Sequence, residues 1–168
     1  MRSALHPVYS NGRWGFANSQ GFLVVPYRYD EAGFFAPQGY VAPVRLGQLW
    51  YFITPKGKQI PTLGYDAIED YHWRSWLVCR QGKWGLVNDY GQEIAPCQYE
   101  DIRRIDEESR LVFGMVETPV RRNGRWGLLD NKGREILACQ YDDVRTIHNG
   151  HAEVRVGNQW HWVRLFTH

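Results

Sequence analysis

The stretch Gly82-Lys83-Trp84-Gly85-Leu86 decides the fold, because the same order of residues returns along the chain. Clear copies begin at Asn11-Gly12-Arg13-Trp14-Gly15 and at Asn123-Gly124-Arg125-Trp126-Gly127. A divergent copy places Gly47 before Trp50-Tyr51-Phe52. In all four copies a glycine follows the tryptophan by 7 residues and a tyrosine follows it by 15 residues. Self-similarity of this kind is the sequence signature of a repeat protein.

An acidic residue directly follows each repeat tyrosine. The repeats differ in length only after that acid. The four acids are Asp30, Asp66, Glu100 and Asp142. Successive opening glycines are 35, 35, 42 and 33 residues apart, counting a partial fifth copy around Trp160-His161-Trp162. We expect a single domain over residues 1–168. Its repeats span about 11–46, 47–80, 81–122 and 123–156, with the partial copy at 157–168.

The segments between the glycines predict an all-β fold. They are short, rich in Val, Ile, Phe, Tyr and Trp, and several alternate at period two. Asn-Gly pairs between such segments are a strong hairpin signal. We expect tandem β-hairpin repeats in an open stacked array rather than a closed barrel or propeller-like ring. The predicted hairpins are 4–18, 40–54, 76–88, 114–130 and 151–165, and the charged stretch 99–108 is expected to be a turn or a single 3₁₀ segment.

Composition and charge exclude several classes of protein. The chain of 168 residues is 43% hydrophobic and 23% charged, which is not a disordered composition. A net charge of +2 without a basic stripe makes nucleic acid an unlikely partner. The sequence contains no apolar run that would form a signal peptide or a membrane span, so we expect a cytoplasmic protein. Three widely spaced cysteines do not form a disulfide framework.

The sequence carries no motif for catalysis, for a cofactor or for a metal. It has no GxSxG, P-loop, HExxH or GxGxxG pattern. His148 and His151 lie on either side of a predicted turn and have no third ligand near them in sequence. The repeated acids are best interpreted as acceptors for nearby backbone N–H groups, and the repeated tryptophans as core residues. We therefore expect a non-enzymatic protein without cofactors.

These residues resemble the WG-repeat, or KWG-repeat, family of bacterial proteins. The family pattern is a Gly, a basic residue, Trp-Gly, a Gly turn, a Pro and then Tyr-Asp, and Gly82 to Glu100 matches it closely. The second and fifth copies depart from it, because Tyr51 and His161 stand where the glycine after the tryptophan is expected. A side chain there would crowd a close approach, so those hairpins are expected to pack differently. The resemblance implies a β-repeat array that binds other molecules, with no common catalytic centre and no agreed ligand.

Two irregular segments are the predicted partner-binding sites, because insertions in repeat arrays usually carry the binding. The first segment, residues 71–76, is rich in aromatic side chains and includes an arginine, a composition typical of binding hot spots. Of its tryptophans Trp73 and Trp76, one is expected to cap the core and the other to be exposed. The second segment is the charged spacer of the third copy, residues 103–110. The candidate residues are Tyr71, His72, Trp73, Arg74, Trp76, Arg103, Arg104, Asp106, Glu107, Glu108 and Arg110.

The leading hypothesis is a protein-binding module, of the immunity or antitoxin type, that binds and neutralises a toxic enzyme. The acidic run Asp106-Glu107-Glu108 would then plug a basic cleft. Two alternatives stay open. One is carbohydrate or cell-wall binding through exposed aromatic residues, and the other is an enzyme that brings two of the repeated acids together.

Overall fold

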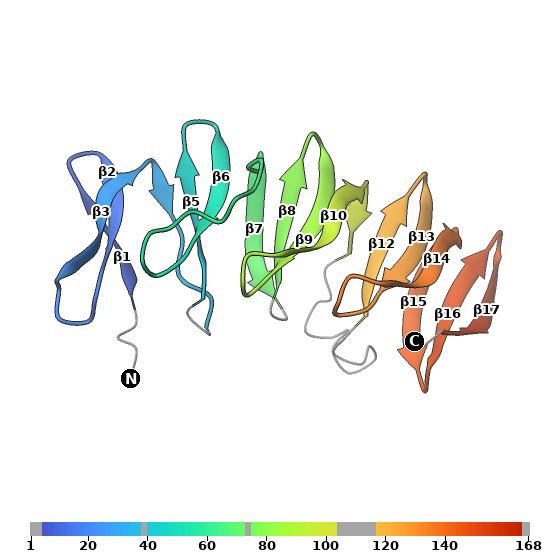
Figure 1. The fold of residues 1–168 in the computed structure, drawn as a ribbon. Coiled ribbons are helices and arrows are strands. Elements are labelled where there is room, and N and C mark those ends of the chain that lie inside the picture. The colour runs from blue at the N-terminus through green and yellow to red at the C-terminus, as the bar shows by residue number, and fades with distance from the viewer. Residues whose placement is uncertain (1–4, 38–39, 73–74, 104–116, 166–168) are drawn as a thin grey trace. The chain divides into compact units, whose positions relative to one another are not determined.

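The structure, a computed structural model, describes residues 5–37, 40–72, 75–103 and 117–165, with the backbone alone for residues 70–72 and 146. Its regular elements are β-strands (Figure 1). The strands are β1 (His6–Ser10), β2 (Arg13–Ala17), β3 (Leu23–Tyr29), β4 (Glu31–Ala32), β5 (Ala42–Leu46), β6 (Leu49–Ile53), β7 (Ala67–His72), β8 (Ser75–Arg80), β9 (Lys83–Asn88), β10 (Glu93–Tyr99), β11 (Asp101–Ile102), β12 (Thr118–Arg122), β13 (Arg125–Leu129), β14 (Glu135–Tyr141), β15 (Asp143–His148), β16 (His151–Val156) and β17 (Gln159–Arg164).

The strands form five small sheets. Their strand orders are β1-β2-β3, β4-β5-β6, β10-β9-β8-β7, β11-β12-β13-β14 and β15-β16-β17. None of these sheets closes into a barrel, and the described residues contain no helix. The predicted all-β repeat array is therefore confirmed. Within the described ranges no helix has the length and apolar character that crossing a membrane requires.

Each predicted hairpin is present, and the turns differ between regular and divergent copies. Both residues of Asn11-Gly12, Gln81-Gly82 and Asn123-Gly124 have positive φ, between 50° and 79°, as type I′ turns require. In Gly47-Gln48 and Gly157-Asn158 the glycine has positive φ, at 62° and 59°, and the second residue does not. That pattern is typical of a type II′ turn. The divergent copies therefore reverse direction through a different turn.

The segment after each hairpin also contributes strands. β3 and β14 pair with β2 and β13 in the same register, so that Trp14 faces Tyr29 and Trp126 faces Tyr141. The residues after each acid then form β4, β7, β11 and β15. The expected turn or 3₁₀ segment at 99–108 is wrong over residues 99–102, where β10 ends and β11 begins; residues 104–108 lie outside the described part of the chain.

The glycine after the repeat tryptophan lets the third strand cross directly over the second. A Cβ atom on Gly15 would lie 2.5 Å from the Val25 carbonyl oxygen, and one on Gly127 would lie 2.4 Å from the Leu137 carbonyl oxygen. Both β2–β3 and β13–β14 shift register at this point, so the third strand bulges over the glycine. The position needs glycine for space, because any side chain would meet backbone atoms.

The second copy, which has Tyr51 in place of this glycine, does not form the continuous third strand. Its third segment keeps only the isolated bridges Trp50–Tyr65 and Ile53–Gln59 within the described residues. A Cβ atom on Gly64 would lie 3.0 Å from Cε1 of Tyr51, so Gly64 leaves room for the tyrosine ring. The structure agrees with the expectation that a side chain at this position changes the packing of the hairpin.

Each acid after a repeat tyrosine binds a backbone N–H in the hairpin turn of the following copy. The accepting carboxylates and donating amides are Asp30 and Gly47 at 2.7 Å, Asp66 and Gln81 at 2.6 Å, Glu100 and Gly124 at 2.9 Å, and Asp142 and Gly157 at 2.6 Å. The prediction that these acids bond backbone amides is confirmed, but the amide belongs to the next copy rather than to the acid's own turn. We call this contact the turn clamp.

The basic residue before the tryptophan pairs with the same acid. Arg13 binds Asp30, Arg125 binds Asp142, and Nζ of Lys83 lies 3.8 Å from Oε1 of Glu100. The hydrogen bond from the Gly124 amide is the main reason that the pKa of Glu100 lies below its usual value, with Lys83 adding to the effect. The basic and acidic positions of the repeat therefore act as one unit.

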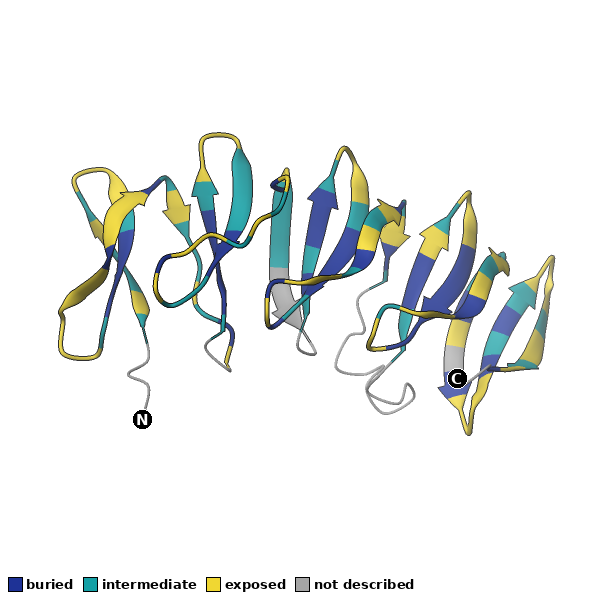
Figure 2. Ribbon diagram, viewed as in Figure 1, coloured by how far each residue is buried: buried dark blue, intermediate teal, exposed yellow. Residues whose placement is uncertain are grey.

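The buried residues form a separate core in each of two compact units. The first unit comprises residues 1–81 and 87–93, and the second comprises residues 82–86 and 94–168. Phe16 and Tyr29 belong to a buried cluster of the first unit, and Leu128 and Val154 to one of the second. Figure 2 shows buried residues along the strands and exposed residues at the turns. That residues 1–168 act as a single domain stays a prediction.

The repeat tryptophans contribute less to these cores than the sequence predicts. Of the five, only Trp126 is buried; the other four are half-buried. Three of the four tyrosines 15 residues later are deeply buried, since Tyr29 and Tyr99 are 2% exposed and Tyr65 is fully buried, while Tyr141 is half-buried. Tryptophan is so large that it is rarely buried on all sides. Each half-buried ring therefore keeps a surface that another group can contact.

We expect Gly127→Ala to destabilise the second unit, because the new methyl group would collide with the backbone of β14. The loss should be about 1–3 kcal/mol in the free energy of unfolding, measured by urea denaturation.

His161→Ala is the matched control, because His161 occupies the same motif position on β17, an edge strand of its sheet. It should change the free energy of unfolding by less than about 0.5 kcal/mol. Equal losses in both variants would contradict the requirement for a glycine under the crossing strand.

A second turn in each regular copy is closed by an Asn or Asp side chain. Oδ1 of Asn18 accepts from the amides of Gln20 and Phe22, and Oδ1 of Asp130 accepts from the amides of Lys132 and Arg134. Burial raises the pKa of Asp130, but the hydrogen bonds and charge of Arg134, with the Lys132 amide, outweigh it, so the pKa lies below its usual value.

Asp130→Asn should reduce the loss of stability in acid. The stabilisation by the Asp130 carboxylate is present above the unfolded-state pKa of about 4 and is lost as the pH falls through the lower folded-state pKa. Asparagine keeps the acceptor, as Asn18 does, but does not titrate. Urea denaturation at pH 7 and pH 3 measures the change; an identical pH dependence in both proteins would contradict this role.

Candidate functional site

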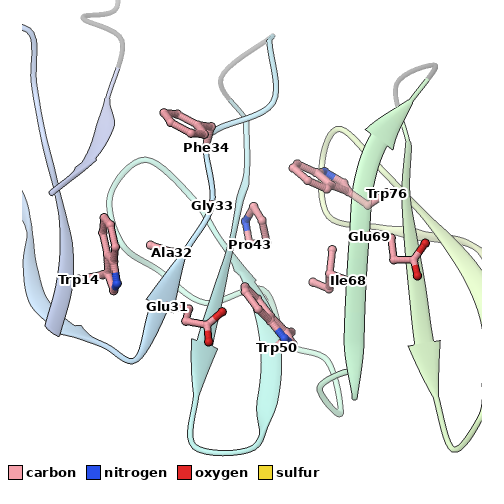
Figure 3. Close-up of a pocket in the computed structure, with 10 residues that line it drawn as sticks. All are labelled: Trp14, Glu31, Ala32, Gly33, Phe34, Pro43, Trp50, Ile68, Glu69 and Trp76. Carbon is pink, nitrogen blue, oxygen red and sulfur yellow. The ribbon is translucent and has the colours of Figure 1, made fainter. Parts of the chain in front are cut away.

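A groove of about 610 Å³ lies within the first unit. Figure 3 shows aromatic side chains around it, with Trp14 on β2, Trp50 on β6 and Trp76 on β8. We call it the tryptophan groove. It is lined by Trp14, Glu31, Ala32, Gly33, Phe34, Pro43, Trp50, Ile68, Glu69 and Trp76. A concave and mostly apolar site with a few polar groups is the usual form of a binding site.

The aromatic lining combines fixed and accessible rings. Trp76 is buried and packs against Phe52, with 5.6 Å between ring centroids. Trp14 and Trp50 are half-buried. Phe34, two residues after the end of β4, leaves 71% of its surface exposed. Phe34 and the exposed parts of the two indole rings together make this surface apolar.

Two carboxylates, those of Glu31 and Glu69, give the groove its charge. Arg45 binds Oε1 of Glu31, yet half of the Glu31 side chain stays exposed. A carboxylate has two oxygens and accepts several hydrogen bonds, so this ion pair leaves Glu31 able to face a second donor. The groove therefore presents apolar rings together with negative charge.

Gly33 and Pro43 give the groove its wall between the tryptophans. The Gly33 amide donates to the Pro43 carbonyl oxygen at 2.9 Å. A Cβ atom on Gly33 would lie 2.7 Å from Cγ of Pro43. A side chain at this position would therefore meet the ring of Pro43.

Of the sequence-predicted aromatic residues, Trp76 is the one whose side chain lies in the described part of the chain, and it lines this groove. Tyr71 and His72 end β7, where only the backbone is described, and Trp73 and Arg74 lie outside the described residues. Trp76 takes the core position that was expected of one of the two tryptophans, and it also lines the groove.

Of the charged spacer, only Arg103 is described. Its guanidinium lies 4.1 Å from the ring centroid of Trp126, and Nη2 donates to Oδ1 of Asp143 at 2.7 Å. Arg103 is thus held by contacts within the second unit. The remaining candidates, Arg104, Asp106, Glu107, Glu108 and Arg110, lie outside the described residues.

Sequence reasoning missed most of the groove, because it assigned the repeat tryptophans to the core and searched for binding sites in the irregular segments. Trp14, Trp50 and Phe34 belong to the regular part of the first two copies. One signal was present: Gly33 stands three residues after the acid Asp30, where the third and fourth copies have Arg103 and Arg145.

The repeated acids are occupied by the turn clamp rather than gathered at the groove. No group of three or more His, Cys, Asp or Glu side chains in the described ranges is arranged to hold a metal ion. The absence of an enzymatic function stays a prediction.

A comparison with known proteins matches the chain to one family model. The model, described as WG containing repeat, matches residues 14–50, 84–113 and 126–160, together more than half of the chain. Residues 51–83, between the first two matched segments, are not matched. They contain most of the second copy, which carries Tyr51 in place of the glycine. A search of curated proteins gives no match.

Proposed function

Because the chain belongs to the WG-repeat family, we propose that it is a non-enzymatic protein-binding module and that the tryptophan groove receives its partner. The observation that carries the proposal is the joint exposure of Phe34 and of the half-buried Trp14 and Trp50 in one groove. Tryptophan and other large aromatic side chains supply much of the energy at the centre of protein interfaces.

The proposed partner is a toxic or effector enzyme, which the chain would neutralise as an immunity or antitoxin protein. The acidic run Asp106-Glu107-Glu108 would plug a basic cleft of that enzyme. This narrower proposal is supported by the charge of the spacer in the sequence.

Carbohydrate or cell-wall binding is the second candidate. Its support is the pairing of two partly exposed tryptophans with two carboxylates in one groove. Eight of the ten residues that line the groove are apolar, whereas a sugar needs many hydrogen-bond partners to replace water. This composition favours a protein partner.

Affinity capture from the native lysate at moderate salt, followed by mass spectrometry, tests the proposal. Phe34→Asp should lower the amount of a stoichiometric protein partner at least about tenfold, because it places a charge in the apolar contact. Phe22→Asp is the matched control, since Phe22 is 67% exposed and does not line the groove. Replacing all three acids of 106–108 with alanine tests the narrower proposal in the same experiment.

A partner that Phe34→Asp still captures in full, or that both phenylalanine variants lose equally, would contradict binding at the groove. Capture of no protein, together with a change in tryptophan fluorescence on titration with glycans, would favour the second candidate.

A further inference from the structure

The first hairpin has an open edge. β1 pairs with β2, and the sheet order β1-β2-β3 leaves the other side of β1 without a strand among the described residues. In the other four sheets a strand occupies that side of the hairpin: β4 lies beside β5, β7 beside β8, β11 beside β12, and β15 beside β16. Each of these added strands comes from the segment that follows the acid of the preceding copy.

The open edge has almost the same sequence as the covered edge of the fourth copy. Residues 7–15 read Pro-Val-Tyr-Ser-Asn-Gly-Arg-Trp-Gly, and residues 119–127 read Pro-Val-Arg-Arg-Asn-Gly-Arg-Trp-Gly. Both hairpins turn through Asn-Gly with positive φ at the two turn residues, and both have the same register. The contacts that residues 119–127 make therefore show what residues 7–15 are able to bind.

The covered edge of the fourth copy binds an extended segment around β11. The Glu100 amide donates to the Arg121 carbonyl at 2.8 Å, and the Arg103 amide donates to the Pro119 carbonyl at 2.9 Å. Oε2 of Glu100 accepts from the Gly124 amide at 2.9 Å, which is the turn clamp. The edge thus offers two carbonyl acceptors and one turn donor to the added strand.

The same three groups are present at the open edge. They are the carbonyl oxygens of Tyr9 and Pro7 and the amide of Gly12. Among the described residues, no added strand binds the two carbonyls and no acid of a turn clamp binds the Gly12 amide. Tyr9 is 60% exposed, so the edge is accessible. An edge strand with unpaired backbone groups is a template for pairing with another chain.

The open edge also leaves one valine less buried than its equivalents. The residue six positions before each repeat tryptophan is valine. In the later copies this valine is fully buried, and the residues are Val44, Val78, Val120 and Val154. Each pairs with an aliphatic residue of the added strand, namely Ala32, Ile68, Ile102 and Val144. Val8 of the first copy is only half-buried, so an aliphatic side chain opposite it would bury further apolar surface.

We infer that the open edge of β1 binds an extended segment of another protein by strand addition, and that this segment carries an acid followed two residues later by an aliphatic residue. The acid binds the Gly12 amide, and the aliphatic residue covers Val8. A second copy of this chain is a poorer source, because its own segments of this pattern are paired within their sheets. The inference goes beyond the proposed function, since neither Val8 nor Gly12 lines the tryptophan groove.

Nuclear magnetic resonance of the full chain, labelled with ¹⁵N, tests the inference. The probe is an unlabelled peptide of residues 98–103, acetylated and amidated at its ends. It should shift the amide resonances of Asn11 and Gly12. Glu100→Gln in the peptide should weaken binding about fivefold, because a hydrogen bond to a carboxylate is stronger than one to a neutral amide. A peptide that leaves both resonances unchanged would overturn the inference.

Two methylated peptides separate strand addition from binding by side chains alone. A methyl group on the Glu100 nitrogen removes the N–H that donates to the Tyr9 carbonyl, and it should weaken binding at least about tenfold. The matched control carries the methyl group on the Ile102 nitrogen, which lies between the two bonded amides of this segment and points away from the hairpin. It should bind within about twofold of the unmodified peptide. Equal binding of the two methylated peptides would overturn the inference.

Variants of β1 give an independent readout. Tyr9→Pro removes the N–H at the open edge and should abolish the peptide-induced shift of Gly12, whereas Tyr9→Ala keeps that N–H and should retain the shift. The comparison of the methylated peptides decides the inference even if Tyr9→Pro does not fold. Sedimentation of the chain without peptide covers the other occupant. A dimer that Tyr9→Pro dissociates would place a second copy at the edge and overturn the assignment to another protein.

Discussion

The structure depends on one contact, the hydrogen bond from a hairpin-turn amide to the acid of the preceding copy. A two-residue turn points its N–H groups outward, and an isolated hairpin is only marginally stable in water. The carboxylate satisfies one of these donors and ties the turn to the copy before it, as Asp142 does for Gly157. For Asp30, Glu100 and Asp142, the lysine or arginine before the tryptophan also balances the charge of the acid. Four such contacts join copies that have little core of their own.

The crossing of the third strand over a glycine is the second constraint, and it decides which copies are regular. Gly15 and Gly127 allow backbone to lie against backbone, and the register of the third strand is then the same in both copies. With Tyr51 the third segment keeps only isolated bridges within the described residues. The groove is lined by residues of this copy and of the first copy.

Much of this arrangement of hairpins could be predicted from the sequence. Turn pairs that contain glycine, such as Asn11-Gly12, indicated the hairpins. The constant spacing of 15 residues from tryptophan to tyrosine reflects the register that pairs Trp14 with Tyr29 and Trp126 with Tyr141. The sequence did not reveal which backbone amide each acid binds, because that amide belongs to the next copy. The groove could not be predicted from the repeat residues alone, because the repeat tryptophans were assigned to the core, whereas Trp14 and Trp50 are half-buried and line the groove. Burial of a ring is a property of its neighbours, and sequence periodicity does not reveal them.

The constant spacing of the copies and the clamp between them therefore hold the array together. The clamp can be observed directly by following the Gly124 amide resonance through an acid titration of the full chain. We predict that its chemical shift follows the protonation of Glu100, with a pKa below the usual value of that side chain, and that Glu100→Gln removes the transition. A Gly124 amide that does not respond to pH between 2 and 6 would contradict the clamp.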